Sequence, residues 1–467
     1  KIEMTNRCRG RWRPYAEKSA SAKNPVLFFL KYLLAAMLFA GCPLGRDIYS
    51  VSYYGNDADV GSAPVDAPAH SEGLTAYTTG QSVTVLGNSG GLAKTGYEFA
   101  GWNTEPDGSG EPHDPAQTFP MGSSDVSLYA MWHNGLAYTL DSGGGAYSVK
   151  AGSAKTGDVI IPAYWRGEPV ASIGAYAFQN CVGLASISIP SSVATIGNNA
   201  FLNCDGLSRI RIPEGVVSIE SRAFAACDRL ESVTLPNSLR SLGSSAFVIC
   251  EKLEDVSIPG GVTTIGNEAF RQCHGLTRVT ISEGVAAIGD MAFTWCNNLR
   301  GLTLPGSLLS IGQDAFYHCD GLASLTIPNR VTSIGKQAFS DCLGLTSLAI
   351  PGSVASIGQD AFYGCTGITS LSLSEGLESI GGFAFEHCSG LASVAIPSSV
   401  TSIGNGAFDH CDSLANARLD PPSPPQTGTP MFTNCASLTA IYVPAQSAEA
   451  YKTAAGWSTY SAIIYPQ

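Results

Sequence analysis

Apolar residues recur along most of this chain at one constant interval. Eleven cysteines from Cys181 to Cys411 are each 23 residues apart, and Cys435 follows after 24 residues. Each of these twelve cysteines has a phenylalanine three residues before it. A single unit of this length cannot bury its own apolar side chains, whereas stacked units place each side chain against its counterpart in the next turn. The interval therefore predicts a repeat solenoid, which is an elongated array and not a globule.

Each repeat also predicts one β-strand. The first full unit carries the L-x-x-L-x-L pattern of leucine-rich repeats at Leu184, Ile187 and Ile189, and a proline ends the strand. The polar residues between these positions are expected to face outward on the concave side. About twelve turns with parallel strands ~4.8 Å apart make a curved rod roughly 55 to 60 Å long. We assign the glycine two residues after most repeat cysteines, such as Gly206, to a left-handed turn.

The first full unit adds three motifs to this strand, namely Ile-Pro, Val-x-x-Ile-Gly and Ala-Phe-x-x-Cys. Together they resemble the Treponema-type, BspA-like leucine-rich repeats of bacterial surface proteins. The resemblance implies a leucine-rich-repeat array that is displayed on a bacterial cell and binds host extracellular proteins or other cells. We assign residues 134–467 to one BspA-like domain with caps at both ends.

The two ends of the predicted solenoid differ from its middle. A solenoid must close its ends, because apolar cross-sections would otherwise face water. Residues 159–174 carry a degenerate first turn that lacks the cysteine, and residues 421–430 interrupt the period near the other end. Residues 447–455 are expected to form a short helix with Ser447 as its N-cap. Trp457 is then available to cover the last turn.

A second, smaller domain is expected over residues 51–133. This part has alternating apolar segments separated by Gly, Asn and Asp turns, which favours a β-rich domain. Its segments 86–92, 96–103 and 128–132 resemble the Listeria/Bacteroides-type repeat, also called the internalin B-repeat. The resemblance implies a β-grasp-like module that serves as a spacer or a weak interaction unit.

One segment of this domain matches a catalytic sequence motif. Residues 87–91 satisfy G-x-S-x-G, the nucleophile elbow of hydrolases, whose serine must lie on a strand-to-helix turn of an α/β sheet. Here the segment lies between short strands without βα alternation. Ser89 is therefore interpreted as a turn residue.

Residues 1–41 are interpreted as a signal peptide with a lipobox. Residues 26–40 are apolar apart from one lysine, and fifteen helical residues reach only about 22 Å, short of a ~30 Å hydrocarbon core. Residues 38–42 resemble the bacterial lipobox. Cys42 is thus expected to carry the lipid that anchors the protein at the bacterial cell surface or outer membrane, with residues 42–50 as a tether. An ordinary secretory signal or an uncleaved anchor is the alternative.

Charge and side-chain chemistry exclude several classes of function. Lys and Arg number 26 and Asp and Glu 38, a net charge of -12, which is the wrong sign for neutralising phosphates. The outward positions of the strands offer no paired carboxylates, no histidine beside a nucleophile and no phosphate-binding glycine loop. We therefore expect no enzyme, no cofactor and no nucleic-acid partner.

The repeat cysteines allow three interpretations: disulfides, metal sites or buried free thiols. Equivalent positions in successive turns point the same way at ~4.8 Å, beyond the ~3.5 to 4.5 Å between Cβ atoms that a disulfide prefers. Zinc needs ligands that converge, whereas this ladder is linear. Buried free thiols are the favoured interpretation.

Three histidines each precede a repeat cysteine: His318, His387 and His410. They indicate either a transition-metal patch or, as we favour at this point, a variable surface position. Trp295, Tyr317 and Tyr363 are expected along the same edge, together with His318. They either form a contact surface or cover the convex side.

Charged residues among the outward strand positions concentrate in the early repeats. Arg209, Arg211, Ser232, Asp255 and Arg278 are the candidate partner-binding residues, and the alternative is that they only solubilise a scaffold. Later repeats carry mainly short hydroxyl side chains. The leading hypothesis is a surface lipoprotein for adhesion, and the second is a passive coat or spacer with antigenic variation.

Overall fold

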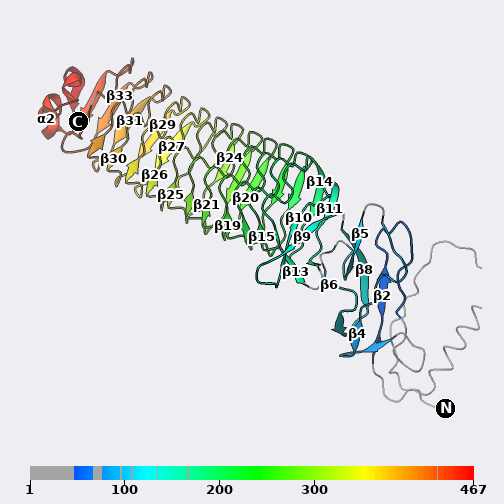
Figure 1. The fold of residues 1–467 in the computed structure, drawn as a ribbon. Coiled ribbons are helices and arrows are strands. Elements are labelled where there is room, and N and C mark those ends of the chain that lie inside the picture. The colour runs from blue at the N-terminus through cyan, green and yellow to red at the C-terminus, as the bar shows by residue number, and fades with distance from the viewer. Residues whose placement is uncertain are drawn as a thin grey trace, which may run out of the picture.

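The computed structural model describes residues 47–66, 76–94, 97–106, 108, 110–133, 135–165, 168–428 and 430–467. These residues form an elongated solenoid with a small β-rich domain at its amino-terminal end (Figure 1), which confirms the predicted fold class. The solenoid has about 14 turns, more than the twelve expected, because a turn at each end lacks the repeat cysteine. Cys42, with the whole predicted leader, lies outside the described residues. Within the described part, none of the helices has the length and apolar character needed to cross a bilayer.

Two ladders of parallel strands run along the solenoid. The first ladder is the predicted one, built from the L-x-x-L-x-L segments. Its strands are β11 (Thr156–Ile160), β14 (Gly183–Ser188), β16 (Arg209–Arg211), β18 (Ser232–Thr234), β20 (Asp255–Ile258), β22 (Arg278–Ile281), β24 (Gly301–Thr303), β27 (Ser347–Ile350), β29 (Ser370–Leu373), β31 (Ser393–Ile396), β33 (Asn416–Leu419), β34 (Ala440–Val443) and β35 (Ile464–Pro466). Residues 322–328, between β24 and β27, form no strand.

The second ladder was not predicted as strands and comes mainly from the Val-x-x-Ile-Gly segments. Its members are β10 (Tyr147–Lys150), β13 (Glu168–Ile173), β15 (Thr195–Ile196), β17 (Ser218–Ile219), β19 (Ser241–Leu242), β21 (Thr264–Ile265), β23 (Ala287–Ile288), β25 (Ser310–Ile311), β26 (Ser333–Ile334), β28 (Ser356–Ile357), β30 (Ser379–Ile380) and β32 (Ser402–Ile403). Equivalent residues pair across turns, for example Ile311 with Ile334. The constant interval therefore stacks like residues over one another.

The phenylalanines form one continuous column through the core. Neighbouring rings from Phe178 to Phe432 stack with centroids 4.9–5.6 Å apart and interplanar angles of 2–24°. Nearly all of them are inaccessible to solvent. Offset stacking of this kind adds to the stability that burial alone provides.

The twelve repeat cysteines are free thiols, and eleven of them are buried. From Cys204 onward, each thiol donates a hydrogen bond to the carbonyl of the phenylalanine in the preceding turn, with Sγ···O distances of 3.0–3.4 Å. Burial raises the pKa of the Cys296 and Cys365 thiols to about 12. These thiols therefore stay protonated at neutral pH and act as small buried side chains that join one turn to the next.

The predicted role of the repeat glycines is wrong. Gly206 and its equivalents do not adopt a left-handed conformation. A Cβ on Gly206 would instead lie 2.6 Å from the carbonyl oxygen of Leu184, so the glycine permits close approach of neighbouring turns. The left-handed positions are the residue before each repeat cysteine and, in every repeat except the last, the residue two before the phenylalanine, as at His387 (φ 59°) and Phe383 (φ 58°).

The amino-terminal end is closed by the degenerate turn and an additional hairpin. Strand β11 overlaps the start of the predicted turn and pairs with β14, and β13 lies within the turn and pairs with β15. Also within the turn, β12 (Tyr164–Trp165) pairs antiparallel with β13, and upstream of it β9 (Ala137–Leu140) pairs antiparallel with β10. The ring of Tyr138 stacks on Trp165 at 4.3 Å.

The carboxy-terminal cap contains η2 (Ala445–Ser447), α2 (Ala448–Thr453) and η3 (Ser458–Ile463). Ser447 occupies the predicted N-cap position, but its hydroxyl donates to the Pro422 carbonyl at 2.5 Å instead of capping the helix. Trp457 is fully buried, and its indole nitrogen donates to the Pro425 carbonyl at 2.9 Å. Tyr460 meets Phe432 edge-on at 5.7 Å and closes the phenylalanine column.

All regular elements in the described part of the small domain are strands. Its main sheet has the order β2 (Val51–Tyr54), β8 (Val126–His133), β5 (Glu98–Asn103) and β6 (Pro112–His113), and two pairs accompany it, β1 (Ile48–Tyr49) with β3 (Tyr77–Thr78) and β4 (Ser82–Thr84) with β7 (Thr118–Pro120). Ser89 lies in a turn that the Asn88 side chain fixes through the backbone of Leu92. The serine is therefore a turn residue, as predicted, and not a nucleophile elbow.

Candidate functional site

The outward side chains of the first ladder form a continuous surface, which we call the strand face. Alternation along each strand points every second residue to solvent, as the exposed–buried–exposed pattern of β16 and β18 shows. Because successive strands pair in register, these outward residues fall into two columns. The repeat therefore sets the spacing within each column.

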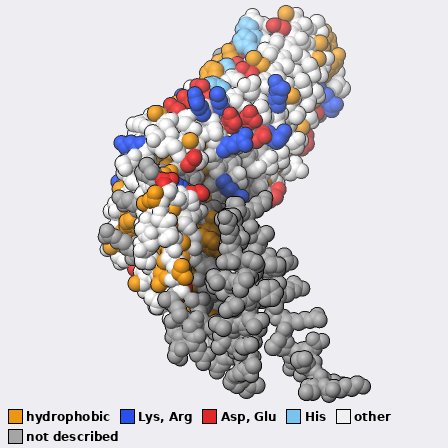
Figure 2. Space-filling model, turned by 90° about the vertical axis from the view of Figure 1, so that its right-hand side faces the viewer, with side chains coloured by type: hydrophobic (Ala, Val, Ile, Leu, Met, Phe, Trp, Pro, Cys, Tyr) orange, Lys and Arg blue, Asp and Glu red, His pale blue; other side chains and the backbone are white. Residues whose placement is uncertain are grey.

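Four of the five predicted partner-binding residues lie in one column. In register, Arg209 pairs with Ser232, Ser232 with Asp255, and Asp255 with Arg278. Arg278 Nη1 lies 3.6 Å from Asp255 Oδ2, and Arg209 Nη2 lies 3.8 Å from Glu231 Oε2. A mixed cluster of basic and acidic side chains is visible on the solenoid in Figure 2. The structure brings the candidate residues together and adds Glu231, which sequence reasoning missed.

These ion pairs contribute little to folding. The side chains of Arg209 and Arg278 are 77% and 68% exposed. Exposed pairs of this kind typically stabilise a protein by about 0 to 1 kcal/mol. Solenoid stability therefore does not require this cluster of charges.

Arg211 occupies the second column, beside Thr234. Its side chain is exposed, and no carboxylate pairs with it among the described residues. Arg211 is therefore the most available cation of the predicted patch. A guanidinium presents five donors in a fixed fork, which suits a carboxylate of a partner.

The later strands present a different surface. Ser347, Ser370 and Ser393 are exposed at the position that Arg209 occupies in the early turns. Near the break in the ladder, a shallow hollow is lined by residues that include Leu302, Leu304 and Thr326. The outward strand positions in the middle of the strand face are therefore uncharged and offer mainly hydroxyl groups, while Arg330 lines the hollow.

A second candidate group, missed from the sequence, lies at the carboxy-terminal end of the strand face. Arg418, Tyr442 and Tyr465 follow one another in register. Tyr442 and Tyr465 are 40% and 45% exposed, and the Arg418 guanidinium pairs with Asp420 at 2.8 Å. Tyrosine and arginine are the residues most often found at the energetic centres of protein interfaces. In the sequence, Arg418 and Tyr442 each lie seven residues after a repeat cysteine. This shared position could have revealed the group, but the insertion 421–430 interrupts the repeat between the two residues.

The histidines lie along a separate edge, beside the repeat cysteines. His318 stacks on Trp295 at 4.1 Å and touches Tyr317 at 4.4 Å, so the predicted aromatic group is partly assembled. Tyr363 contacts His387 instead, at 5.4 Å. His318 also lies between two carboxylates, with Nδ1 3.4 Å from Asp320 Oδ1 and Nε2 3.7 Å from Asp341 Oδ2.

Comparison with known families agrees with this architecture. Residues 171–300, 287–415 and 332–458 match the BspA type leucine rich repeat region. Residues 49–131 match the Listeria-Bacteroides repeat domain. Both matches fall on the parts of the chain where the sequence motifs had suggested them.

Solved structures and curated proteins provide further relatives. A leucine-rich repeat protein from Bacteroides ovatus is 29% identical, with 71% of this chain and 98% of that chain covered and a TM-score of 0.45. A leucine rich cell surface protein from Faecalibacterium prausnitzii is 27% identical, with 71% and 96% covered and a TM-score of 0.42. Two Evansella cellulosilytica proteins, whose names assign them provisionally to the membrane, are 35% identical over 127 residues (24% of this chain) and 40% identical over 99 residues (21% of this chain). The chain spans only 18% and 10% of the lengths of these two relatives.

Proposed function

The chain belongs to the BspA type leucine rich repeat family, and from this membership we propose that it is a non-enzymatic bacterial surface lipoprotein. Its strand face adheres to host extracellular proteins or to other cells. Lipidation of Cys42 holds it at the cell surface or outer membrane, and the small domain acts as a spacer. The words "cell surface" in the name of the Faecalibacterium relative and the membrane assignment of the Evansella relatives support this location.

The observation that carries the proposal is the column of Arg209, Ser232, Asp255 and Arg278, with Arg211 beside it. These charged side chains are exposed on a rigid strand face, and their ion pairs are too exposed to stabilise the fold appreciably. Charges arranged on a fixed scaffold steer association and select the partner that carries the complementary pattern. Binding through this surface therefore explains charges that folding does not need.

Reversal of the three arginines tests this binding surface. We expect the variant Arg209→Glu, Arg211→Glu, Arg278→Glu to weaken binding to an extracellular-matrix protein by at least about tenfold, because like charges would then face each other across the interface. The measurement is the Kd of the full chain for each member of a panel of purified matrix proteins, by surface plasmon resonance. Unchanged affinity of the variant would remove these arginines from the interface.

A matched control reverses the same number of charges elsewhere. Arg222, Lys336 and Lys150 are exposed and lie outside the strands of the first ladder. Their reversal to Glu changes the net charge equally, so a specific interface predicts nearly unchanged affinity. Equal losses in both variants would indicate only a general effect of charge.

A passive coat or spacer is the second candidate function. The uniform hydroxyl surface at Ser347, Ser370 and Ser393 favours it, because such a surface lacks the aromatic and arginine anchors of tight interfaces. Absence of sub-micromolar binding to every matrix protein tested would favour the coat. Protection of the protein from protease added to intact cells would contradict both functions.

A further inference from the structure

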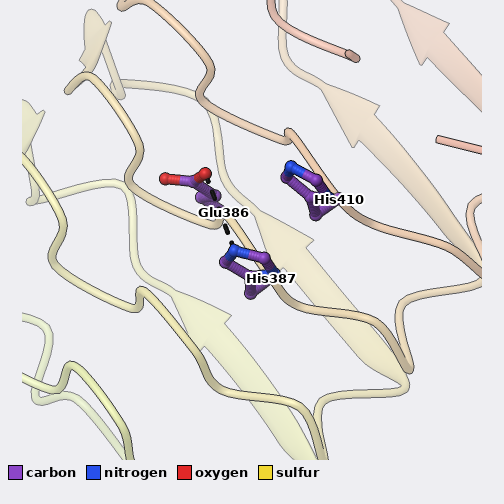
Figure 3. Close-up of side chains that lie close together, drawn as sticks. All are labelled: Glu386, His387 and His410. Carbon is purple, nitrogen blue, oxygen red and sulfur yellow. Dashed lines mark ion pairs between the residues drawn. The ribbon is translucent and has the colours of Figure 1, made fainter. Parts of the chain in front are cut away.

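Two histidines and a glutamate converge on the edge beside the repeat cysteines. Glu386, His387 and His410 each offer one ligand atom, and these atoms all lie within 4.8 Å of one another. Figure 3 shows the two imidazoles side by side, with the Glu386 carboxylate next to His387. His387 Nε2 lies 3.8 Å from Glu386 Oε1, and the two rings stack at 4.5 Å. Among the residues that the structure describes, this is the one set of at least three such groups that meets this spacing.

The solenoid backbone fixes the spacing of these side chains. His387 and His410 hold the left-handed position before a repeat cysteine, with φ of 59° and 56°. Their backbone N–H groups donate to the Asp409 and Thr433 carbonyls of the following turns, both at 2.9 Å. The rings therefore remain one turn apart, and their arrangement does not depend on a flexible loop.

We propose that Glu386, His387 and His410 bind one divalent first-row transition-metal ion, of which Zn²⁺, Ni²⁺ and Cu²⁺ suit imidazole and carboxylate ligands. Ligand atoms on a tetrahedral ion with bonds of about 2.0 to 2.1 Å lie roughly 3.4 Å apart. To share one ion, the two imidazoles must rotate out of their stacked arrangement, because the lone pair of each nitrogen lies in the plane of its own ring. The His387 side chain is 43% exposed, so solvent or a partner's side chain completes the coordination.

The surroundings of the three ligands fit a bound cation. The side-chain amide of Asn434 lies 3.1 Å from His410 Nε2. With its oxygen turned toward this nitrogen, the amide accepts the Nε2 hydrogen and leaves Nδ1 for the metal, as outer-shell partners of metal ligands do. The carboxylates of Asp360 and Asp409 lie close enough to act electrostatically on Glu386. Sequence reasoning favoured a variable surface position because it saw two histidines without Glu386, the third ligand.

Removal of the two imidazoles tests the site. We expect the full chain to bind one Zn²⁺ that the variant His387→Ala, His410→Ala binds at least about tenfold more weakly, because loss of even an outer-shell partner costs 10- to 100-fold in affinity. The measurement is isothermal titration with zinc chloride in a non-coordinating buffer. A parallel measurement is the thermal unfolding temperature with and without Zn²⁺, since binding to the folded state raises it.

The matched control removes two other histidines from the same solenoid. His274 bonds to Asn297, and His318 lies between carboxylates in a turn without a second imidazole. The variant His274→Ala, His318→Ala should keep the affinity and the zinc-dependent shift of the unaltered chain. The conservative variant Glu386→Gln should weaken binding while both imidazoles remain. No saturable binding to the unaltered chain, or equal affinities in all four proteins, would overturn the proposal.

Discussion

Phe316→Ala is expected to destabilise the solenoid by about 3 to 5 kcal/mol. Phe316 is fully buried in the middle of the column, between Phe293 at 5.2 Å and Phe339 at 5.1 Å. Truncation removes both stacking contacts and leaves a cavity, because neighbouring turns are held by backbone hydrogen bonds and cannot collapse onto the space. The free energy of unfolding in urea, followed by circular dichroism, measures this loss.

Phe383→Ala provides the matched control, because it removes the same atoms from the surface. Phe383 is 36% exposed and lies outside the column. We expect its truncation to cost far less than that of Phe316. If both variants lost the same free energy, the column would not be the structural element that joins the turns.

Trp457→Ala is expected to have a comparable effect that stays close to the carboxy-terminal end. Trp457 is fully buried, packs edge-on against Tyr451 at 5.0 Å and bonds to the Pro425 carbonyl. Loss of a buried tryptophan typically costs about 3 to 5 kcal/mol. Stability in a solenoid depends on contacts between adjacent repeats, so the last turns should open first.

Hydrogen exchange of individual backbone amides measures which turns lose stability in the Trp457→Ala variant. Protection should decrease in β33 and β34 and remain unchanged in β16 and β18. Tyr442→Ala removes an exposed ring from the same end and should leave protection in β33 nearly unchanged. A uniform loss of protection along the chain after Trp457→Ala would contradict the nearest-neighbour account.

Most of the fold could be predicted because the interval itself carries the information. A constant spacing of cysteines and phenylalanines requires equivalent residues to lie over one another, and that geometry also places Arg209, Asp255 and Arg278 in one column. Neither conclusion depends on the conformation within a turn.

Conformation within each turn was less predictable. The glycine that was assigned to a left-handed turn instead allows close packing, and the left-handed positions hold diverse residues such as Trp295 and Ile249. The bond from each thiol to the preceding phenylalanine carbonyl joins atoms of different turns. The spacing of residues within one repeat predicts neither the close packing at the glycine nor the hydrogen bond of the thiol, because both are contacts with a neighbouring turn.

The candidate sites also contain some features that the repeat interval predicted and others that it did not. Residues at one repeat position, such as Arg209 and Arg278, were correctly placed on one face from sequence alone. Partners at a different repeat position, such as Glu231 beside Arg209 and Glu386 beside His387, could be identified only from the structure. Side-chain length and direction decide such pairs, and the repeat interval specifies only the backbone.

Distances between spin labels at equivalent positions test the central claim, which is that the 23-residue interval stacks like residues along one axis. Ser232, Ser347 and Ser370 are exposed at the same repeat position. With parallel strands ~4.8 Å apart, labels five and six turns from Ser232 should lie about 24 and 29 Å away. Pulsed electron paramagnetic resonance on cysteine-linked labels, in a chain whose accessible native thiols have been replaced, should give distances that grow with the number of turns. Distances unrelated to the number of turns would contradict the account.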